Sequence, residues 1–285
     1  MSSADNSDNP GQTPVPSTVR KAWPHSDFVQ DLAELQRVGP LTHCNSNSVG
    51  AALMANVLLA VGASPAMIAA REEVVEFAAL ASGVLINLAS VTEDRADNLL
   101  LSAEAAQRAG TPWVFDPVAI GVLKFRTRLA HELLRFKPAV IKGNASEILA
   151  LAGLDGHAKG VDATVPSVDA LASALELAKK TGAVIAITGT VDFVTDGRQI
   201  IEIPGGHPVM ARVTGTGCAL GALIAALLGV CPTPLRAASS AAAIFAVAGE
   251  QAGRETNGPG SFVVRFLDLL SQLGNGDFSN GDGNE

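Results

Sequence analysis

A regular alternation of short apolar runs with longer helical stretches constrains the fold of this chain most strongly. The runs, at residues 83–89, 112–116, 139–142 and 183–188, have the residue types and lengths of buried strands. The stretches between them predict helices at residues 95–109, 128–136, 145–152 and 168–180, several of them closed by glycine. Continuous apolar strands joined by helices predict an α/β fold, with a mostly parallel sheet covered on both faces.

The end of this alternation predicts a hairpin. Residues 193–195 and 199–203 are β-prone and flank Asp196-Gly197, a dipeptide typical of tight β-turns. We expect an antiparallel hairpin at the edge of the sheet, and an almost wholly helical chain after Cys218.

The body at residues 28–273 shows no internal linker and is expected to be one domain. The polar segments 1–27 and 274–285 are expected to be disordered tails.

Charge and cysteine usage exclude several classes of protein. The net charge is −8 without an extended basic stripe, which argues against a nucleic-acid partner. The densest basic spot, residues 124–128, is either solvated surface or a contact to a nucleotide phosphate. The longest apolar run, residues 218–230, is too short to cross a bilayer. The three cysteines lack metal-like spacing, and no signal peptide is evident, so we expect a cytoplasmic protein and no membrane partner.

The segment VTGTGCALG, residues 213–221, predicts an anion-binding helix start. Its glycines allow close approach of the backbone to a ligand, and a long apolar helix follows. The first amides of a helix lack internal partners and attract negative charge. Cys218 lies at the mouth of this site, either as a partly ionised thiol that serves as nucleophile or base, or as a small buried apolar residue. An anion site beside such a group suggests phosphoryl transfer.

Ligands of open α/β sheets bind at the carboxyl ends of the strands. Asn87, Asp116 and Thr188 end predicted strands, and Lys142 opens the turn after another. Asp116 either helps to hold Mg²⁺ or starts a turn before proline. Lys142 has two possible roles, as a contact to a nucleotide phosphate or as a surface cation. Thr188 either contacts the phosphate or ribose of a nucleotide or is only the last residue of its strand.

The segment Asn144-Ala145-Ser146-Glu147 has two interpretations. It is close to a capping box, in which Asn144 caps the helix and Glu147 reaches back, and spacing alone favours that role. Glu147 also faces the same rim as Asp116, where two carboxylates would suit Mg²⁺.

Other motifs narrow the class of enzyme. No P-loop occurs, and the glycine spacing from Gly215 to Gly221 misses the dinucleotide fingerprint.

Near the front of the chain, Asn45 and Asn47 either bind a small heteroaromatic molecule or a neighbouring chain, or serve as turn and cap residues. Met67 lines a pocket or fills the core.

Several collinear stretches across residues 39–268 identify a family. They are PLTHCNSNSV, ANVLLAVGASPAM, LINLASVTEDR, TPWVFDPVAIG, RFKPAVIKGNASEILALAG, AITGTVDFVTDG, GGHPVMARVTGTGCALGA and GPGSFVVRFLD. With them the chain resembles the hydroxyethylthiazole kinases of the ribokinase-like superfamily. The resemblance implies transfer of the γ-phosphate of ATP to the hydroxyl of 4-methyl-5-(2-hydroxyethyl)thiazole, for thiamine biosynthesis or salvage.

The resemblance also implies roles for individual residues. The thiazole alcohol would contact Met67 and Gly215, ATP would contact Lys142 and Thr188, Mg²⁺ would be held by Asp116 and Glu147, and Cys218 would be the base. Members look like homotrimers with active sites between subunits, which would place Asn45 near a neighbour's pocket. The chain departs from the family pattern at Lys142, where arginine is usual, and in HCNSNSV, where His-x-Ile-Thr-Asn-x-Val is more common.

Two other functions are compatible with parts of this pattern. An ATP-dependent NAD(P)H-hydrate dehydratase has a related fold, but it needs an aspartate at the position of Cys218. A thiazole-binding regulator without catalysis would not require Asp116, Glu147, Lys142 and Cys218 together.

Overall fold

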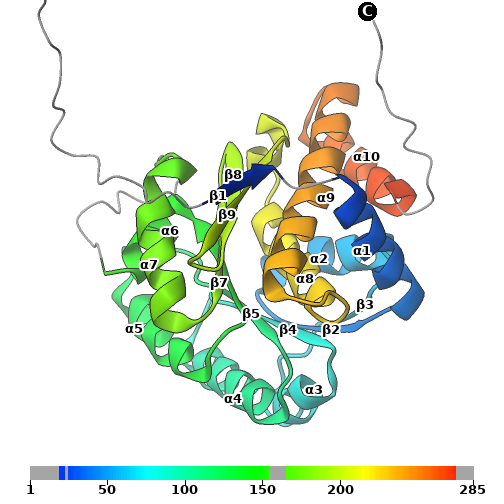
Figure 1. Ribbon diagram of the computed structural model, residues 1–285. Coiled ribbons are helices and arrows are strands. Elements are labelled where there is room, and N and C mark those ends of the chain that lie inside the picture. Colours follow the sequence, from blue (N-terminus) through cyan, green and yellow to red (C-terminus); the bar gives the residue numbers. More distant parts are fainter. Residues whose placement is uncertain (1–18, 23–24, 154–164, 274–285) are drawn as a thin grey trace, which may run out of the picture.

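A computed structural model gives the structure of residues 19–22, 25–153 and 165–273 (Figure 1). One nine-stranded sheet has the order β1-β9-β8-β7-β6-β5-β4-β2-β3. Only β8 runs antiparallel to its neighbours in the described part of the sheet. The strands are β1 (Val19–Ala22), β2 (Leu41–Asn45), β3 (Ser64–Ala66), β4 (Gly83–Asn87), β5 (Trp113–Asp116), β6 (Val140–Asn144), β7 (Val184–Thr188), β8 (Val191–Thr195) and β9 (Gln199–Pro204).

Helices cover both faces of the sheet, as the sequence predicts. The chain from α3 to α7 lies along one face, and α1, α2, α8, α9 and α10 lie along the other (Figure 1). The helices are α1 (His25–Val38), α2 (Ser48–Ala60), α3 (Val74–Leu80), α4 (Glu93–Ala109), α5 (Lys124–Leu133), α6 (Ala145–Leu151), α7 (Leu171–Thr181), α8 (Thr216–Leu228), α9 (Pro234–Glu255) and α10 (Pro259–Gln272). Short 3₁₀ turns occur at Leu134–Phe136, Ser167–Ala170 and Pro208–Arg212.

Alternating side chains divide the core between the two faces. In β4, Val84 and Ile86 pack with the α3–α7 layer, whereas Leu85 packs with α8 and its neighbours. This alternation follows from the two-residue period of a strand. Since both faces are apolar, the strand reads as a continuous apolar run in the sequence, which is why β4 to β7 were predictable.

The N-terminal segment and the position of the hairpin differ from the prediction. The β8–β9 hairpin forms, but β1 pairs in parallel with the outer side of β9, so the hairpin lies one strand inside the edge. β1 thereby pairs backbone groups of β9 that would have no partner if β9 were the edge strand. Both β1 and the beginning of α1 fall within residues 1–27, which we expected to be a disordered tail. The rest of that tail and residues 274–285 lie outside the described residues, and a single domain at 28–273 stays a prediction.

Candidate active site

Polar side chains gather where the parallel strands end, beside the start of α8. Asn87 ends β4, Asp116 ends β5, and Lys142 lies near the end of β6. All three are almost fully buried. In open α/β sheets this edge is the usual place for a ligand, so the strand-end rule placed these residues correctly together.

The start of α8 presents free amides. Gly215 is the N-cap with φ of +91°, and none of the described side chains caps the helix. The positive φ favours glycine, and a Cβ on Gly215 would be crowded, since it would lie 3.2 Å from the Cα of Gly50 in α2. The first helical bond joins the Ala219 amide to the Gly215 carbonyl at 2.8 Å. The amides of residues 216–218 precede that bond, and an anion is the natural partner for them.

A buried ion pair lies directly under these amides. The Lys142 Nζ donates to Asp116 Oδ2 at 3.0 Å and to the Gly217 carbonyl at 3.1 Å. Burial lowers the pKa of Lys142, but the charges of Asp116 and Glu147 outweigh burial and hold that pKa above its ordinary value. Lys142 is therefore a permanent cation at the floor of the site and not a surface residue.

Asp116 keeps one acceptor available. Its Oδ2 accepts from Asn87 Nδ2 at 2.7 Å and from Lys142, whereas Oδ1 is buried without a hydrogen-bond partner among the described residues. A buried carboxylate oxygen without a partner is costly, and it marks a place for a cation or a donor from a ligand.

Cys218 lies against two asparagines. Asn87 Nδ2 is 3.3 Å and Asn47 Nδ2 is 3.8 Å from its Sγ, and Asn47 also donates to Asn87 Oδ1 at 3.2 Å. Burial, followed by the charge of Asp116, raises the pKa of the Cys218 thiol; Lys142 and the asparagines act in the opposite direction. The expectation of a partly ionised resting thiol is therefore wrong, because the desolvation at the helix start exceeds the favourable effect of the nearby donors.

Glu147 has the capping role that its spacing predicts. Its Oε2 accepts from the Asn144 amide at 2.8 Å, and Asn144 Oδ1 accepts from the Glu147 amide at 2.9 Å. Its Oε1 accepts from the Ala119 amide at 3.0 Å, in the loop that follows Asp116. Burial, then the charge of Asp116, raises the pKa of Glu147. The same carboxylate thus joins the cap of α6 to the loop beside Asp116.

A cavity of about 230 Å³ adjoins the start of α8. Thr188, Asp192, Thr216 and Gly217 line its polar side, and its apolar wall is formed by Ile203, Met210, Leu220, Phe245 and Ala246. Asp192 accepts from the Gly189 amide at 2.9 Å. Burial raises the pKa of Asp192 to about 6. Sequence reasoning missed Asp192; its polar side chain in a β-prone run was the available signal.

Two predicted substrate residues lie apart from this cluster. Asn45 is buried and its Nδ2 is 3.5 Å from the Asn98 carbonyl of α4, on the other face of the sheet. Met67 follows the edge strand β3 and is 37% exposed. Asn47, which composition favoured as a cap, does cap α2 through the Gly50 amide at 2.7 Å and also reaches Cys218. Within the described residues Asn47 contacts Cys218, and the role of Asn45 near a neighbour's pocket stays a prediction.

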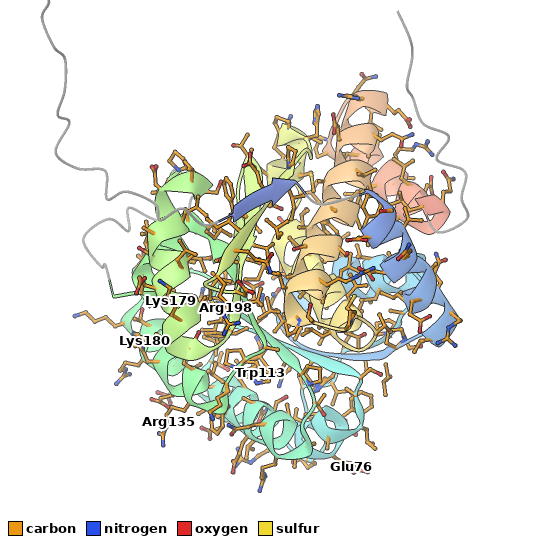
Figure 2. The ribbon with its side chains drawn as sticks, in the orientation of Figure 1. Glu76, Trp113, Arg135, Lys179, Lys180 and Arg198 are labelled. Atoms are coloured by element: carbon orange, nitrogen blue, oxygen red, sulfur yellow. The ribbon has the colours of Figure 1, made fainter. Side chains whose placement is uncertain are left out.

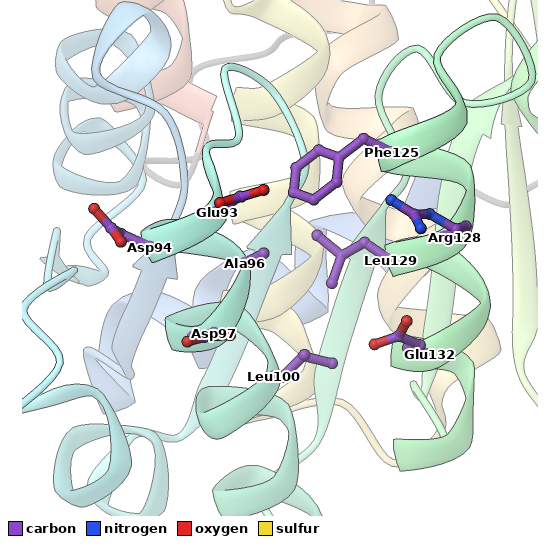
Figure 3. Close-up of a pocket in the computed structure, with 9 residues that line it drawn as sticks. All are labelled: Glu93, Asp94, Ala96, Asp97, Leu100, Phe125, Arg128, Leu129 and Glu132. Atoms are coloured by element: carbon purple, nitrogen blue, oxygen red, sulfur yellow. The ribbon is translucent and has the colours of Figure 1, made fainter.

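Other prominent features of the surface are separate from this cluster. A larger hollow of about 490 Å³ lies between α4 and α5, and none of the predicted site residues lines it (Figure 3). The exposed side chains labelled in Figure 2 include Arg135 in the 3₁₀ turn after α5, and Lys179 and Lys180 in the last turn of α7. These helix ends lie at the opposite end of the strands from Asp116, so their charges are not part of the anion site.

The described residues contain neither a preformed metal cluster nor a membrane-spanning helix. No group of three or more His, Cys, Asp and Glu side chains within residues 19–22, 25–153 and 165–273 could hold a metal ion by itself. None of the helices in the same residues combines the length and apolar character that crossing a lipid bilayer requires.

Comparisons with known proteins identify the family of this chain. The sequence profile of the hydroxyethylthiazole kinase family matches residues 32–276. A hydroxyethylthiazole kinase of Leptospira borgpetersenii is 54% identical over 260 residues, which cover 91% of this chain and 98% of that protein. The solved structure of the Pyrococcus horikoshii hydroxyethylthiazole kinase protein superposes with a TM-score of 0.80 at 37% identity, covering 87% of this chain and 93% of that one. A ribokinase-like superfamily protein of Enterococcus faecalis superposes at 0.59 with 14% identity, covering 90% and 92%, and shows the fold alone.

Proposed function

The chain belongs to the hydroxyethylthiazole kinase family, and from that premise we propose how its site transfers the γ-phosphate of ATP to the hydroxyl of 4-methyl-5-(2-hydroxyethyl)thiazole. The observation that carries the proposal is the meeting of three groups in one buried cluster: the uncapped amides of residues 216–218, the Lys142 ammonium and the Asp116 carboxylate. Phosphoryl transfer passes through a loose transition state whose charge is spread over the phosphoryl oxygens. Fixed amides and a permanent cation stabilise that charge without reorganisation.

The nucleotide would occupy the cavity beside α8. Its base and ribose fit the apolar wall around Leu220 and Phe245, and Thr188 would contact the phosphates or the ribose. The triphosphate would then run past Gly217 toward Lys142. Gly217 lines the cavity and its carbonyl accepts from the Lys142 Nζ at 3.1 Å, so the cavity leads to the ammonium.

The acidic pair fits Mg²⁺ held together with phosphate. Asp116 Oδ1 has no other partner among the described residues, and Glu147 lies across the same edge. Mg²⁺ typically takes one or two carboxylates and completes its shell with phosphate oxygens and water, so the two carboxylates at this edge are sufficient protein ligands for it. When bound, Mg²⁺ would neutralise charge on the phosphate oxygens.

The acceptor alcohol would lie against Cys218. Asn47 and Asn87 fix the position of the sulfur, and Gly215 lets the backbone approach the substrate. The hydroxyl proton leaves late in a loose transition state, so a small thiolate fraction is sufficient for turnover. Because the pKa of Cys218 is raised, this thiolate is a strong base once formed.

We propose that a homotrimer completes the site, with each active site between two subunits. Large apolar side chains are exposed on α2, on α3 and after β3, the edge strand of the sheet: Val49, Leu59, Met67, Val75 and Leu80. A second subunit packed against the β3 edge of the sheet, which α2 and α3 flank from opposite faces, would cover them and bring Met67, and the loop after Asn45, to a shared thiazole pocket. Exposed apolar patches commonly mark such interfaces.

The cysteines support a cytoplasmic location for this enzyme. Cys44, Cys218 and Cys231 are all free thiols, which suits a reducing compartment.

The test is an ADP-release assay with purified protein, ATP, Mg²⁺ and the thiazole alcohol. We expect ATP consumption that depends on the alcohol, with formation of the thiazole phosphate seen by mass spectrometry. Thiazole binding without turnover would instead identify a regulator, and turnover of hydrated NADH a dehydratase.

A further inference from the structure

A strained residue lies in the loop between Asp116 and α5. Ala119 has φ of +60°, in the left-handed region that residues with a Cβ rarely adopt. It is 4% exposed, so the loop is packed and the conformation is not that of a free turn. Strained backbone of this kind persists only where surrounding contacts determine it, and it gathers at functional sites.

The contacts that hold Ala119 come from both sides of a single peptide group. The amide of Ala119 donates to Glu147 Oε1 at 3.0 Å. The carbonyl of the preceding Val118 belongs to the same peptide group and accepts from Arg126 Nη1 at 3.2 Å. The positive guanidinium lies at the negative, carbonyl end of the peptide dipole. The negative carboxylate lies at its positive, amide end. Each contact therefore strengthens the other.

Arg126 is well placed for this role. It lies in the first turn of α5, is partly buried and keeps further N–H donors on its fork. Burial lowers the pKa of Arg126, while the charge of Glu147 acts in the opposite direction, so the two groups are within electrostatic reach. Arg128, two residues further along the same helix, is exposed and lines the hollow between α4 and α5 instead (Figure 3).

We propose that Arg126 is a positioning residue for the reaction: through the Val118–Ala119 peptide it holds Ala119 in its left-handed conformation and aims the Glu147 carboxylate at the site. The loop between Asp116 and Gly121 is then a clamp that fixes both carboxylates relative to each other. The inference rests on the proposed role of Glu147 in the kinase site. One residue of the basic segment 124–128, Arg126, then serves the reaction without contacting a phosphate directly.

The variant Arg126→Gln tests the clamp, with Arg128→Gln as the matched control. In the protein without ligands, we expect hydrogen exchange of the amides at 118–121 to increase about tenfold in Arg126→Gln. We expect kcat to fall about tenfold, with the KM for the thiazole alcohol unchanged. Arg128→Gln should change neither quantity. If Arg126→Gln does not fold, Arg126→Lys, which keeps the positive charge but loses the planar fork of donors, should give intermediate changes of the same sign.

A second substitution separates the clamp from direct contact with the triphosphate. Glycine adopts a positive φ without strain, so Ala119→Gly added to Arg126→Gln should recover most of the lost kcat. Absence of recovery would show that Arg126 acts on the nucleotide directly and would overturn the inference. Equal exchange in the Arg126→Gln and Arg128→Gln proteins would overturn it as well. If the wild-type protein has no kinase activity, the proposed function fails, while the exchange measurement still decides whether the clamp exists.

Discussion

Replacing Lys142 by methionine tests the electrostatic basis of the site. The Nζ lies 3.0 Å from Asp116 Oδ2, and the two side chains are 6% and 0% exposed. At this separation their attraction is about 5 kcal/mol with an effective dielectric constant of about 20. Methionine keeps the length of the side chain but leaves Asp116 as a buried charge without its counter-ion. Losing one partner of a buried pair costs about 3–5 kcal/mol, so we expect a Tm decrease of roughly 6 °C or more.

The exposed pair of Lys179 and Glu176 provides the control. Its 2.8 Å separation is similar, but its side chains are 52% and 75% exposed, and such pairs contribute about 0–1 kcal/mol. Urea unfolding at pH 7.5 of Lys142→Met and Lys179→Met compares the two directly. Equal losses of unfolding free energy would refute the argument that Lys142 is the buried counter-ion of Asp116. Lys142→Met should also abolish ADP release, whereas Lys179→Met should retain it.

Four further outcomes are expected. Cys218→Ala should retain its affinity for ATP and lose kcat on the order of a hundredfold; unchanged turnover in the ADP-release assay would remove Cys218 from the mechanism. Because burial raises the pKa of this thiol, wild-type kcat should still be increasing with pH between about 7 and 9, and a flat profile would count against a thiolate base. The pKa of Asp192 is raised from 3.8 to about 6, so the folded state binds more protons and stability should fall as pH rises across that interval; urea unfolding of Asp192→Asn should show a weaker fall, and an identical fall would exclude Asp192 as its source. Leu59→Asp should shift the protein toward monomers in light scattering, and an unchanged trimer would place the interface elsewhere.

The part of the fold predictable from sequence is the part with a continuous local signal. Strands β4 to β7 are apolar on both sides because each contributes to two cores, and Asp196-Gly197 marks the hairpin. β2 and β3 were not predicted. The residues of β2 include Thr42, His43 and Asn45, which are polar and yet buried. Their pairing with β4 and β3 comes from contacts distant in sequence, which a local pattern cannot contain.

The candidate site also has features that the local sequence predicts and features that depend on distant contacts. The strand-end rule brought together Asp116 and Lys142, and the capping box of Glu147 was legible from its spacing. The ionisation of Cys218 could not be predicted from the sequence. The pKa of this thiol depends on burial and on Asp116, which is more than a hundred residues away in the chain. The contact of Asn47 with Cys218 likewise arises only when α2 packs beside α8.

A crystal structure with a non-hydrolysable ATP analogue, Mg²⁺ and the thiazole alcohol tests the central claim most directly. The account predicts that the γ-phosphate accepts hydrogen bonds from the amides of residues 216–218 and from Lys142. Mg²⁺ should lie between the phosphates and Asp116, and the alcohol oxygen should lie beside Cys218. A triphosphate bound away from the start of α8 would contradict the account.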